Sequence, residues 1–364
     1  MSWLYGRLDL ERSPDARRGT PTLERTRRLL RLLGDPQDDY PVISVTGTNG
    51  KTSTSRILAA LLEGFGLSVG VHTSPHLEKV NERLARAGEA IPDHELVEVL
   101  SSVALAEDHI REEDCGAEAL PSYFEVLTAA AYRWFADLAV QVTVAEVGLG
   151  GRWDATNVAD AAMAVVTNVA VDHVEYLGPS RASIAAEKAG IVKPGCVLIL
   201  GETDPELTGL FLAAPPSRVL LRERDFGVLR SRPIPEGRVV DLFTPGAVYS
   251  DLHLSLHGAF QADNAALALA AAEAFLGDRE LDRSAVSRAF AGLRSPGRVE
   301  IIHGRPLILL DGAHNPAGAA ALGATLEEEF DHGSRTLVVG MLEGRDPEAM
   351  LGALGVERVD RLVC

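Results

Sequence analysis

The sequence predicts an α/β protein in which a parallel sheet is covered by flanking helices. Short runs rich in β-branched residues alternate with longer segments of helical period, which is the order of strand–helix–strand units. The runs at residues 41–46, 68–73, 140–147 and 162–169 are almost purely apolar. Strands of that kind are buried on both faces, as in parallel sheets whose two sides carry helices.

Three segments have the spacing or composition of helices that pack on such a sheet. The run YFEVLTAAAYRWF at residues 123–135 predicts one helix, and the alanine-rich run at residues 261–277 predicts a longer one. A third helix is expected directly after the first strand. Its apolar stripe consists of Ile57, Leu58, Leu61, Leu62 and Phe65.

The chain length of 364 residues favours two domains. Residues 217–257 contain short strands with Gly and Pro turns, which predict a small antiparallel appendage. The helical pattern is interrupted at residues 293–298, so we expect one domain at residues 1–293 and a second at residues 298–364. The second has a renewed strand–helix rhythm that predicts a smaller Rossmann-like α/β domain. It is short beside the usual domain size of about 100 to 150 residues.

The charge, the apolar runs and the cysteines indicate which partners and which compartment to expect. With 35 basic and 52 acidic residues the net charge is −17, which disfavours binding to nucleic acid or to an anionic membrane. No apolar run reaches the roughly 18 residues of a membrane span, and the first residues lack a signal-peptide core. Cys115, Cys196 and Cys364 are widely spaced, as expected of buried or idle thiols in a reducing compartment. We therefore expect a cytoplasmic protein.

A phosphate-binding turn is predicted by VISVTGTNGKTSTSRILAALL at residues 42–62, where a strand, a Gly-containing turn and a helix follow one another. Backbone N–H groups and the helix N-terminus would face phosphate. Lys51 could neutralise the terminal phosphates of a nucleotide, and the Thr52 hydroxyl could reach Mg²⁺. The turn is shorter than the general P-loop because Val45 stands five positions before Gly50. The alternative is an ordinary turn with a lysine in solvent.

Acidic and imidazole groups follow later strands. Glu146 ends the run VTVAE, where a buried carboxylate would be costly without a metal or cation; a side chain turned to solvent is the alternative. His173 follows Asp172 at another strand end and could be a metal ligand, a phosphate donor or a core residue. Glu187 and Lys188 lie on a short helix and by themselves indicate a surface charge pair.

Seven blocks together resemble the Mur ligase superfamily, over residues 20–345. They are TGTNGKTST, TSPHL at 73–77, EVGLGGRWDATN at 146–157, VDHVEYLG at 171–178, AAEKAGI at 185–191, SPGR at 295–298 and DGAHNP at 311–316. SPHL, GLGGRWDATN and EKAGI in particular resemble the folylpolyglutamate synthase/dihydrofolate synthase family.

The resemblance implies an ATP-dependent ligase that forms an acyl phosphate and joins L-glutamate to dihydropteroate, to a reduced folate, or to both. It implies Mg²⁺ and a monomer, and it leaves open whether a monovalent cation assists. One alternative is a Mur-type ligase with another carboxylate acceptor, against which TSPHL and GLGGRWDATN argue. Another is a nucleotide-binding protein that has lost turnover through a shortened C-terminal domain.

The resemblance also implies roles for individual residues. The catalytic residues would be Lys51, His173, Lys188 and His314. The nucleotide would be bound by Thr48, Asn49, Gly50, Lys51, Thr52, Ser53, Asn264, Arg298 and Asp311. The metal ligands would be Thr52, Ser74, Glu146, His173 and Lys188, the last of them carbamylated in this family. The pterin or its glutamate would meet Tyr123, Phe124, Arg152, Asp154 and Ala155.

Overall fold

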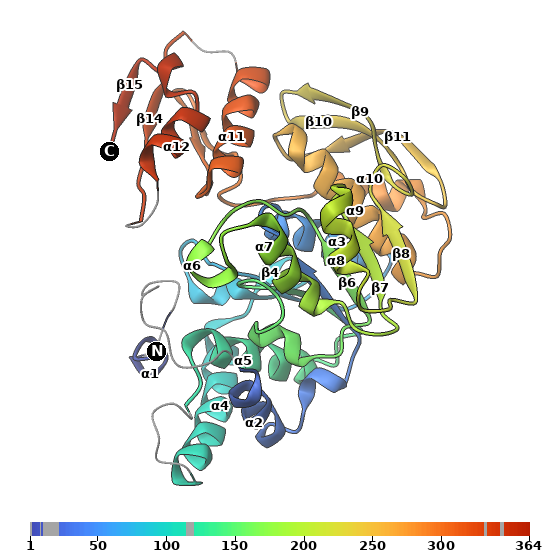
Figure 1. Cartoon of the computed structure of the whole chain (residues 1–364), viewed down its shortest axis with the longest axis vertical. Coiled ribbons are helices and arrows are strands. Elements are labelled where there is room, and N and C mark those ends of the chain that lie inside the picture. The colour runs from blue at the N-terminus through green and yellow to red at the C-terminus, as the bar shows by residue number, and fades with distance from the viewer. Residues whose placement is uncertain (1, 8, 10–21, 114–119, 331–332, 343–345) are drawn as a thin grey trace.

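The fold is described from a computed structural model, which covers residues 2–7, 9, 22–113, 120–330, 333–342 and 346–364 (Figure 1). Its largest element is a sheet with the strand order β4-β3-β2-β5-β1-β6-β7-β8. The six strands from β2 to β8 in that order are parallel, while β3 and β4 form an antiparallel extension at one edge. The strands are β1 Val42–Thr46, β2 Val69–His72, β3 Leu84–Arg86, β4 Glu89–Ala90, β5 Val142–Glu146, β6 Met163–Val166, β7 Val197–Leu200 and β8 Arg218–Leu221.

Helices cover both faces of this sheet (Figure 1). Because successive side chains of a strand point to opposite faces, Ile43 and Val45 of β1 enter one core while Val42 enters another. The first core lies against α3 Lys51–Gly64, α9 Ala259–Phe275 and α10 Arg283–Ala291. The opposite face is covered by α2 Glu24–Leu32, α4 Asp93–Glu113, α5 Tyr123–Asp137, α7 Arg181–Lys188 and α8 Pro205–Phe211.

The antiparallel appendage is a three-stranded sheet in the order β11-β10-β9. It comprises β9 Gly227–Ile234, β10 Gly237–Phe243 and β11 Val248–Leu254. The expectation that this sheet starts near residue 217 was wrong for β8, which pairs in parallel with β7 of the large sheet. Strand partners lie far apart in sequence, so the local pattern of β8 did not reveal its neighbour.

The elements after α10 form a second lobe (Figure 1). It contains the antiparallel pair β12 Glu300–Gly304 and β13 Leu307–Leu310, the parallel pair β14 Thr336–Val338 and β15 Arg361–Val363, and the helices α11 Pro316–Glu329 and α12 Pro347–Ala353. A small core of Ala319, Met350 and Leu354 joins the two helices. The predicted fold class is thereby confirmed, and the predicted domain boundary at residues 293–298 falls between α10 and β12.

The structure also describes the two features that the sequence analysis considered for the whole chain, membrane-spanning helices and cysteines. Within the described ranges, no helix has the length and apolar character that crossing a membrane requires. Cys196 is a buried free thiol and Cys364 an exposed one, while Cys115 lies outside the described residues.

Candidate active site

The turn between β1 and α3 lies at the carboxyl edge of the sheet, where parallel α/β proteins bind ligands. Gly50 has φ +82°, and a Cβ there would lie 2.4 Å from Oδ1 of Asn264. A Cβ on Gly47, φ +152°, would lie 1.7 Å from Oγ1 of Thr167. Both positions require glycine because of their backbone conformation and because neighbouring side chains fill the space.

The turn is held rigidly by the segment that follows β6. Oγ1 of Thr167 and Nδ2 of Asn168 donate to the Asn49 carbonyl oxygen at 2.6 and 3.0 Å. The Asn49 N–H donates in return to Oδ1 of Asn168 at 3.1 Å, and the Thr48 N–H donates to the Asn168 carbonyl at 2.9 Å. The turn is therefore preorganised, as phosphate binding by backbone N–H groups requires.

Lys51 folds back over the turn instead of extending into solvent. Its Nζ donates to the carbonyl oxygens of Gly47 and Thr48 at 3.1 and 3.3 Å. Burial lowers the pKa of Lys51, while the charges of Glu146 and Asp172 raise it in part. Since its partners among the described residues are two carbonyl groups, this partly desolvated ammonium is available to a nucleotide's phosphates.

Glu146 brings three predicted metal ligands together. Its side chain is 1% exposed, so it is not turned to solvent. Oε1 accepts from the Thr52 hydroxyl at 2.9 Å, and Oε2 accepts from the Ser74 N–H at 3.3 Å. Burial raises the pKa of Glu146, and the nearby Lys51 lowers it in part. A carboxylate bonded to the Thr52 hydroxyl, with Ser74 held beside it through its backbone, offers hard oxygen donors that fit Mg²⁺.

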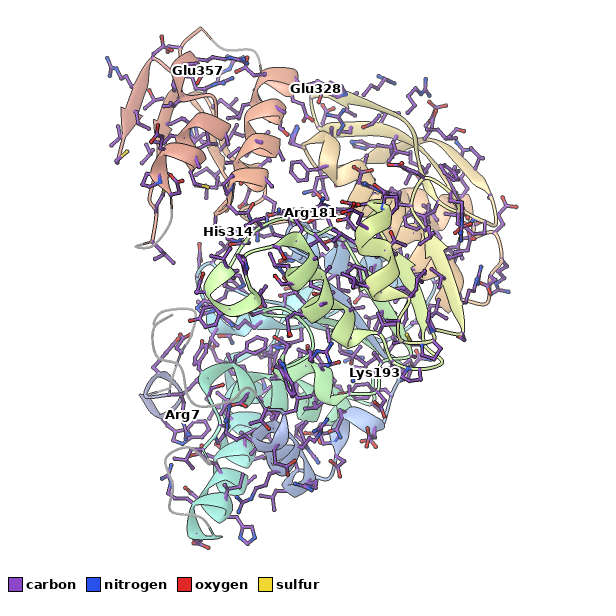
Figure 2. The ribbon with its side chains drawn as sticks, in the orientation of Figure 1. Arg7, Arg181, Lys193, His314, Glu328 and Glu357 are labelled. Carbon is purple, nitrogen blue, oxygen red and sulfur yellow. The ribbon has the colours of Figure 1, made fainter. Side chains whose placement is uncertain are left out.

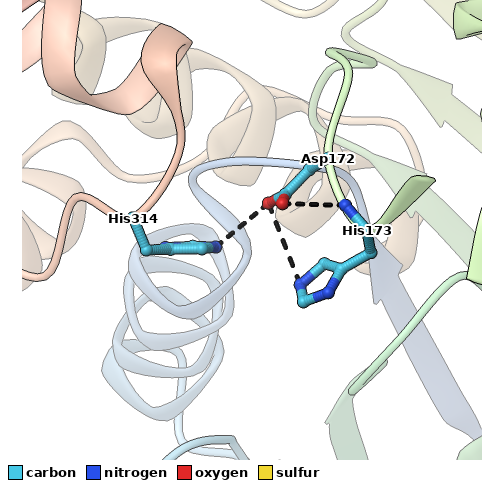
Figure 3. Close-up of side chains that lie close together, drawn as sticks. All are labelled: Asp172, His173 and His314. Atoms are coloured by element: carbon cyan, nitrogen blue, oxygen red, sulfur yellow. Dashed lines mark hydrogen bonds and ion pairs between the residues drawn. The ribbon is translucent and has the colours of Figure 1, made fainter. Parts of the chain in front are cut away.

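A second cluster joins the two lobes (Figure 3). Asp172 is buried, and its Oδ2 lies 3.1 Å from Nε2 of His314 and 3.9 Å from Nε2 of His173. Asn315 donates to the same oxygen at 2.9 Å. The carboxylate and the two imidazoles lie within 4.8 Å of one another, close enough for one metal ion. His314 belongs to the second lobe and faces the large sheet across the lobe boundary (Figure 2).

Lys188 is not part of a surface charge pair. Its side chain is 3% exposed, and its Nζ donates to the Gly47 carbonyl oxygen at 2.8 Å. Burial, with a further contribution from the charge of Lys51, lowers the pKa of Lys188 well below its ordinary value. Glu187 instead is half-buried at the cleft, where its carboxylate lies 3.9 Å from Arg152. Lowering the pKa of an amine favours its neutral, nucleophilic form, which is the form that carbamylation requires.

The four residues expected to be catalytic line one small cavity. These are Lys51, His173, Lys188 and His314, which share it with Asp172. A larger cleft between the lobes adjoins it and is lined by Lys51, Glu146 and His173 together. The phosphate-binding turn, the acid and the imidazole thus surround the same space.

The residues expected to bind the nucleotide all line this cleft. Ser53 is fixed by Gln261, whose Nε2 donates to the Ser53 hydroxyl at 3.2 Å, and Asn264 donates to the same Gln261 at 2.9 Å. Asp311 accepts backbone N–H groups of residues 299 and 313 at 2.9 and 2.7 Å, while burial raises its pKa. The nucleotide set along the cleft is Thr48, Asn49, Gly50, Lys51, Thr52, Ser53, Asn264, Arg298 and Asp311.

Of the five residues expected to bind the acceptor, three line the cleft and two do not. Phe124, Asp154 and Ala155 line the cleft, but Tyr123 and Arg152 do not. Tyr123 is 2% exposed and packs in the core under the Arg83 guanidinium, because the first turn of α5 presents neighbouring residues to different sides. Arg152 is exposed and points its Nη2 at the Ala186 carbonyl, 3.4 Å away. The prediction that these two line the acceptor pocket is not supported by their positions.

The residues that hold the phosphate-binding turn in place were not identified in the sequence analysis. Asn168 and Thr167 hold the turn, and Asn315 donates to Oδ1 of Asn49 at 3.0 Å from the second lobe. The Asp154 carboxylate stabilises its own loop, because it accepts hydrogen bonds from the N–H groups of residues 149 and 156 at 3.0 Å each. Thr167 and Asn168 directly follow a buried strand, so the rule that ligands meet parallel sheets at carboxyl ends could have found them.

The chain matches the Mur ligase middle domain over residues 128–272 and the Mur ligase, glutamate ligase domain over residues 297–364. Both matches agree with the two lobes and with the site between them. The fold and the site therefore define the chain as a Mur ligase.

Individual relatives narrow this class. The dihydrofolate synthase/folylpolyglutamate synthase of Mycobacterium tuberculosis is 43% identical over 350 residues, covering 92% of this chain and 72% of that protein. The folylpolyglutamate synthase of Lacticaseibacillus casei is 36% identical, over 90% of this chain and 77% of its own length. The chain belongs to the folylpolyglutamate synthase/dihydrofolate synthase family.

Solved structures agree with this assignment. Mycobacterium tuberculosis folylpolyglutamate synthase complexed with ADP superposes with a TM-score of 0.92 at 41% identity, over 99% of this chain and 80% of that one. A folylpolyglutamate synthase complex with AMPPCP and folate gives a TM-score of 0.90 at 33% identity, over 99% and 87%.

Proposed function

We propose that the chain joins L-glutamate to the carboxylate of dihydropteroate, of a reduced folate, or of both, at the expense of ATP. The acceptor carboxylate attacks the γ-phosphorus, ADP leaves, and an acyl phosphate forms. The glutamate amine then attacks the acyl carbon, phosphate leaves, and the amine loses a proton as the amide forms. The observation that carries this proposal is the grouping of Lys51, Glu146, His173, Lys188 and His314 around the cleft between the lobes and the small cavity that adjoins it.

The residues act mainly by positioning and by electrostatics. The turn and Lys51 bind the terminal phosphates, with Asn264 and Asp311 placed along the same cleft for the nucleoside. His314 approaches from the second lobe, so the site is complete when the lobes are in contact. Solved neighbours bound to ADP, AMPPCP and folate support the nucleotide and the acceptor class.

Mg²⁺ completes the proposed site. Thr52, Ser74 and Glu146 would hold one ion, and His173 with a carbamylated Lys188 would hold a second. Bound Mg²⁺ supplies positive charge that stabilises the transferring phosphoryl group. Carbamylation would turn the buried Lys188 amine into a carboxylate-like ligand, which fits its depressed pKa and its contact with the turn.

We also propose that the protein acts as a cytoplasmic monomer without a nucleic-acid or membrane partner. The proposed site draws every side chain from one chain, and the net charge of −17 opposes polyanions.

An ADP-release assay tests the proposed reaction. Purified protein is supplied with ATP and Mg²⁺, with or without L-glutamate, and with dihydropteroate or tetrahydrofolate. We expect ADP release that needs both glutamate and a pterin acceptor. ATP binding without substrate-dependent ADP release would contradict the proposal, and release only with an acceptor lacking the pterin would assign the chain another substrate.

A further inference from the structure

Arg56 lines the cleft, and it has no role in the reaction proposed above. It lies on α3 five positions after Lys51, about one and a half helical turns further on, and its half-buried side chain lines the cleft. Across the described ranges of the chain, its guanidinium forms no hydrogen bond and no ion pair. A half-buried guanidinium with five N–H donors and no protein acceptor is ready for a ligand.

The neighbouring carboxylates are engaged elsewhere. Burial lowers the pKa of Arg56, and the charges of Glu146, Glu82 and Glu300 raise it in part, so these groups lie near it. Glu82 accepts three backbone N–H groups of residues 77–79 at 2.8 to 2.9 Å, and Glu300 accepts one at 2.8 Å. Glu146 accepts the two hydrogen bonds already described. None of the three neutralises the guanidinium by direct contact.

A second guanidinium faces the same region. Arg298, on the segment that links the lobes, lines the cleft and lowers the pKa of Arg56 through its charge. Its Nη1 donates to the Gly297 carbonyl oxygen at 3.1 Å. A Cβ on Gly312 would lie 2.2 Å from that same nitrogen, so the side chain is fixed against the second lobe. Glu146 lies near both guanidiniums and offsets part of their mutual repulsion, but it makes no direct contact with either. An anion bound between the two cations would reduce the remaining repulsion.

We propose that Arg56 binds a phosphate or carboxylate group of a substrate, and that it does so together with Arg298 at a subsite separate from the Lys51 turn. The inference rests on the proposed function, whose substrates carry both kinds of oxyanion: the ATP phosphates beyond those held by the turn, and the carboxylates of glutamate and of the acceptor. The planar guanidinium fork suits either group. Because Arg298 lies on the segment that links the lobes, an anion bound to both residues would also favour lobe contact.

Steady-state kinetics of Arg56→Met and Arg56→Lys test this subsite, with ATP, L-glutamate and acceptor each varied separately. We expect Arg56→Met to raise KM for at least one substrate by about 10- to 100-fold, the loss typical of a charge-assisted hydrogen bond. The kcat should fall by less than about 3-fold, and Arg56→Lys should recover part of the loss because it keeps the charge. The exposed Arg86, outside the cleft, supplies the control Arg86→Met, which should match wild type.

The pattern of KM identifies the anion. A raised KM for ATP, with weaker ADP binding by calorimetry, assigns the subsite to a nucleotide phosphate. A raised KM for glutamate or acceptor, with ATP unchanged, assigns it to a carboxylate. If both variants fold, by thermal unfolding, and every KM stays within about twofold of wild type, the inference is overturned while the ligase function stands. A wild type without glutamate-dependent ADP release would overturn the proposed function and this inference with it.

Discussion

Lys188 places a primary amine in the interior, 2.8 Å from the carbonyl oxygen of Gly47. The same oxygen accepts a hydrogen bond from Lys51, so two lysines meet at the start of the phosphate-binding turn. Such proximity is unfavourable for two full charges, and it depresses the pKa of Lys188 in addition to the effect of burial. The surroundings of the Lys188 amine therefore favour a role in chemistry over a role in stabilising the fold.

Replacing Lys188 by Ala should lower kcat by at least about 100-fold, because the proposed metal ligand and the contact with the turn are both lost. The ADP-release assay measures the change. Lys193→Ala is a matched control, since this half-buried lysine donates to the Asn157 carbonyl at 3.3 Å and does not line the cleft. Turnover of Lys188→Ala within about threefold of wild type would remove Lys188 from the mechanism.

At the scale of elements, α5 shows how a helix terminus sets up the acceptor side of the cleft. Ser122 caps the helix: its hydroxyl accepts from the Glu125 N–H at 3.3 Å, and Glu125 accepts from the Ser122 N–H at 2.7 Å. Phe124 lies in this first turn and lines the cleft. A capping box thus fixes the position of a side chain expected to contact the pterin.

Ser122→Ala should lower the free energy of unfolding by about 1 kcal/mol, because one N-terminal N–H loses its acceptor. Urea denaturation measures the effect, and the KM for the acceptor should rise as the first turn loosens. Ser101→Ala is the control, because that exposed hydroxyl bonds within α4 to the Val97 carbonyl. An unchanged unfolding midpoint for Ser122→Ala would show that the cap does not stabilise α5.

Local patterns predicted the strands, the turn and α5 because their signals lie within a few neighbouring residues. The depth of Lys188 was not visible in the sequence, since its burial depends on a contact with Gly47, 141 positions away. The membership of β8 in the large sheet also depends on a distant partner. The neighbours Tyr123 and Phe124 could not be told apart from the sequence either. The packing of α5 buries the Tyr123 ring in the core and leaves the Phe124 ring at the cleft.

At the scale of the whole molecule, the two lobes are tied together at a second place, away from the cleft. Arg238 of the antiparallel sheet is 1% exposed and bonds Glu328 at 3.0 Å and Glu329 at the end of α11. Glu329 also accepts from the Gly258 N–H at 2.8 Å and contacts Nδ1 of His257 at 2.8 Å. Figure 2 shows Glu328 on the side of α11 that faces the antiparallel sheet.

Arg238→Met should lower the free energy of unfolding by about 3 kcal/mol, because it leaves the buried Glu329 carboxylate without its guanidinium. Urea denaturation measures the loss. The exposed Arg230, which pairs with Asp241 and Asp251 on the same sheet, provides the control Arg230→Met, and we expect a clearly smaller loss because solvent screens these exposed ion pairs. Equal effects of the two substitutions would contradict a special role for the buried contact.

The same contact predicts a pH dependence. Burial raises the pKa of Glu329, but hydrogen bonds from His257, Gly258 and Arg238 outweigh burial, so its pKa lies below the ordinary value of 4.5. A depressed folded-state pKa contributes stability that is complete above about pH 4.5 and is lost as the pH falls through the folded value. Urea midpoints from pH 7 to pH 3 should fall more steeply for wild type than for Glu329→Gln. Parallel curves would show that this carboxylate contributes no pH dependence.

The most direct test of the proposed phosphate site is Lys51→Ala, measured by ADP release together with ADP calorimetry and thermal unfolding. Loss of the ammonium should reduce turnover at least about 100-fold and weaken ADP binding. The unfolding temperature should stay within a few degrees because, among the described residues, the Lys51 ammonium bonds only to carbonyl groups of its own turn. Preserved turnover in a clearly destabilised variant would contradict the account, since Lys51 would then support the fold and leave the phosphates to other groups.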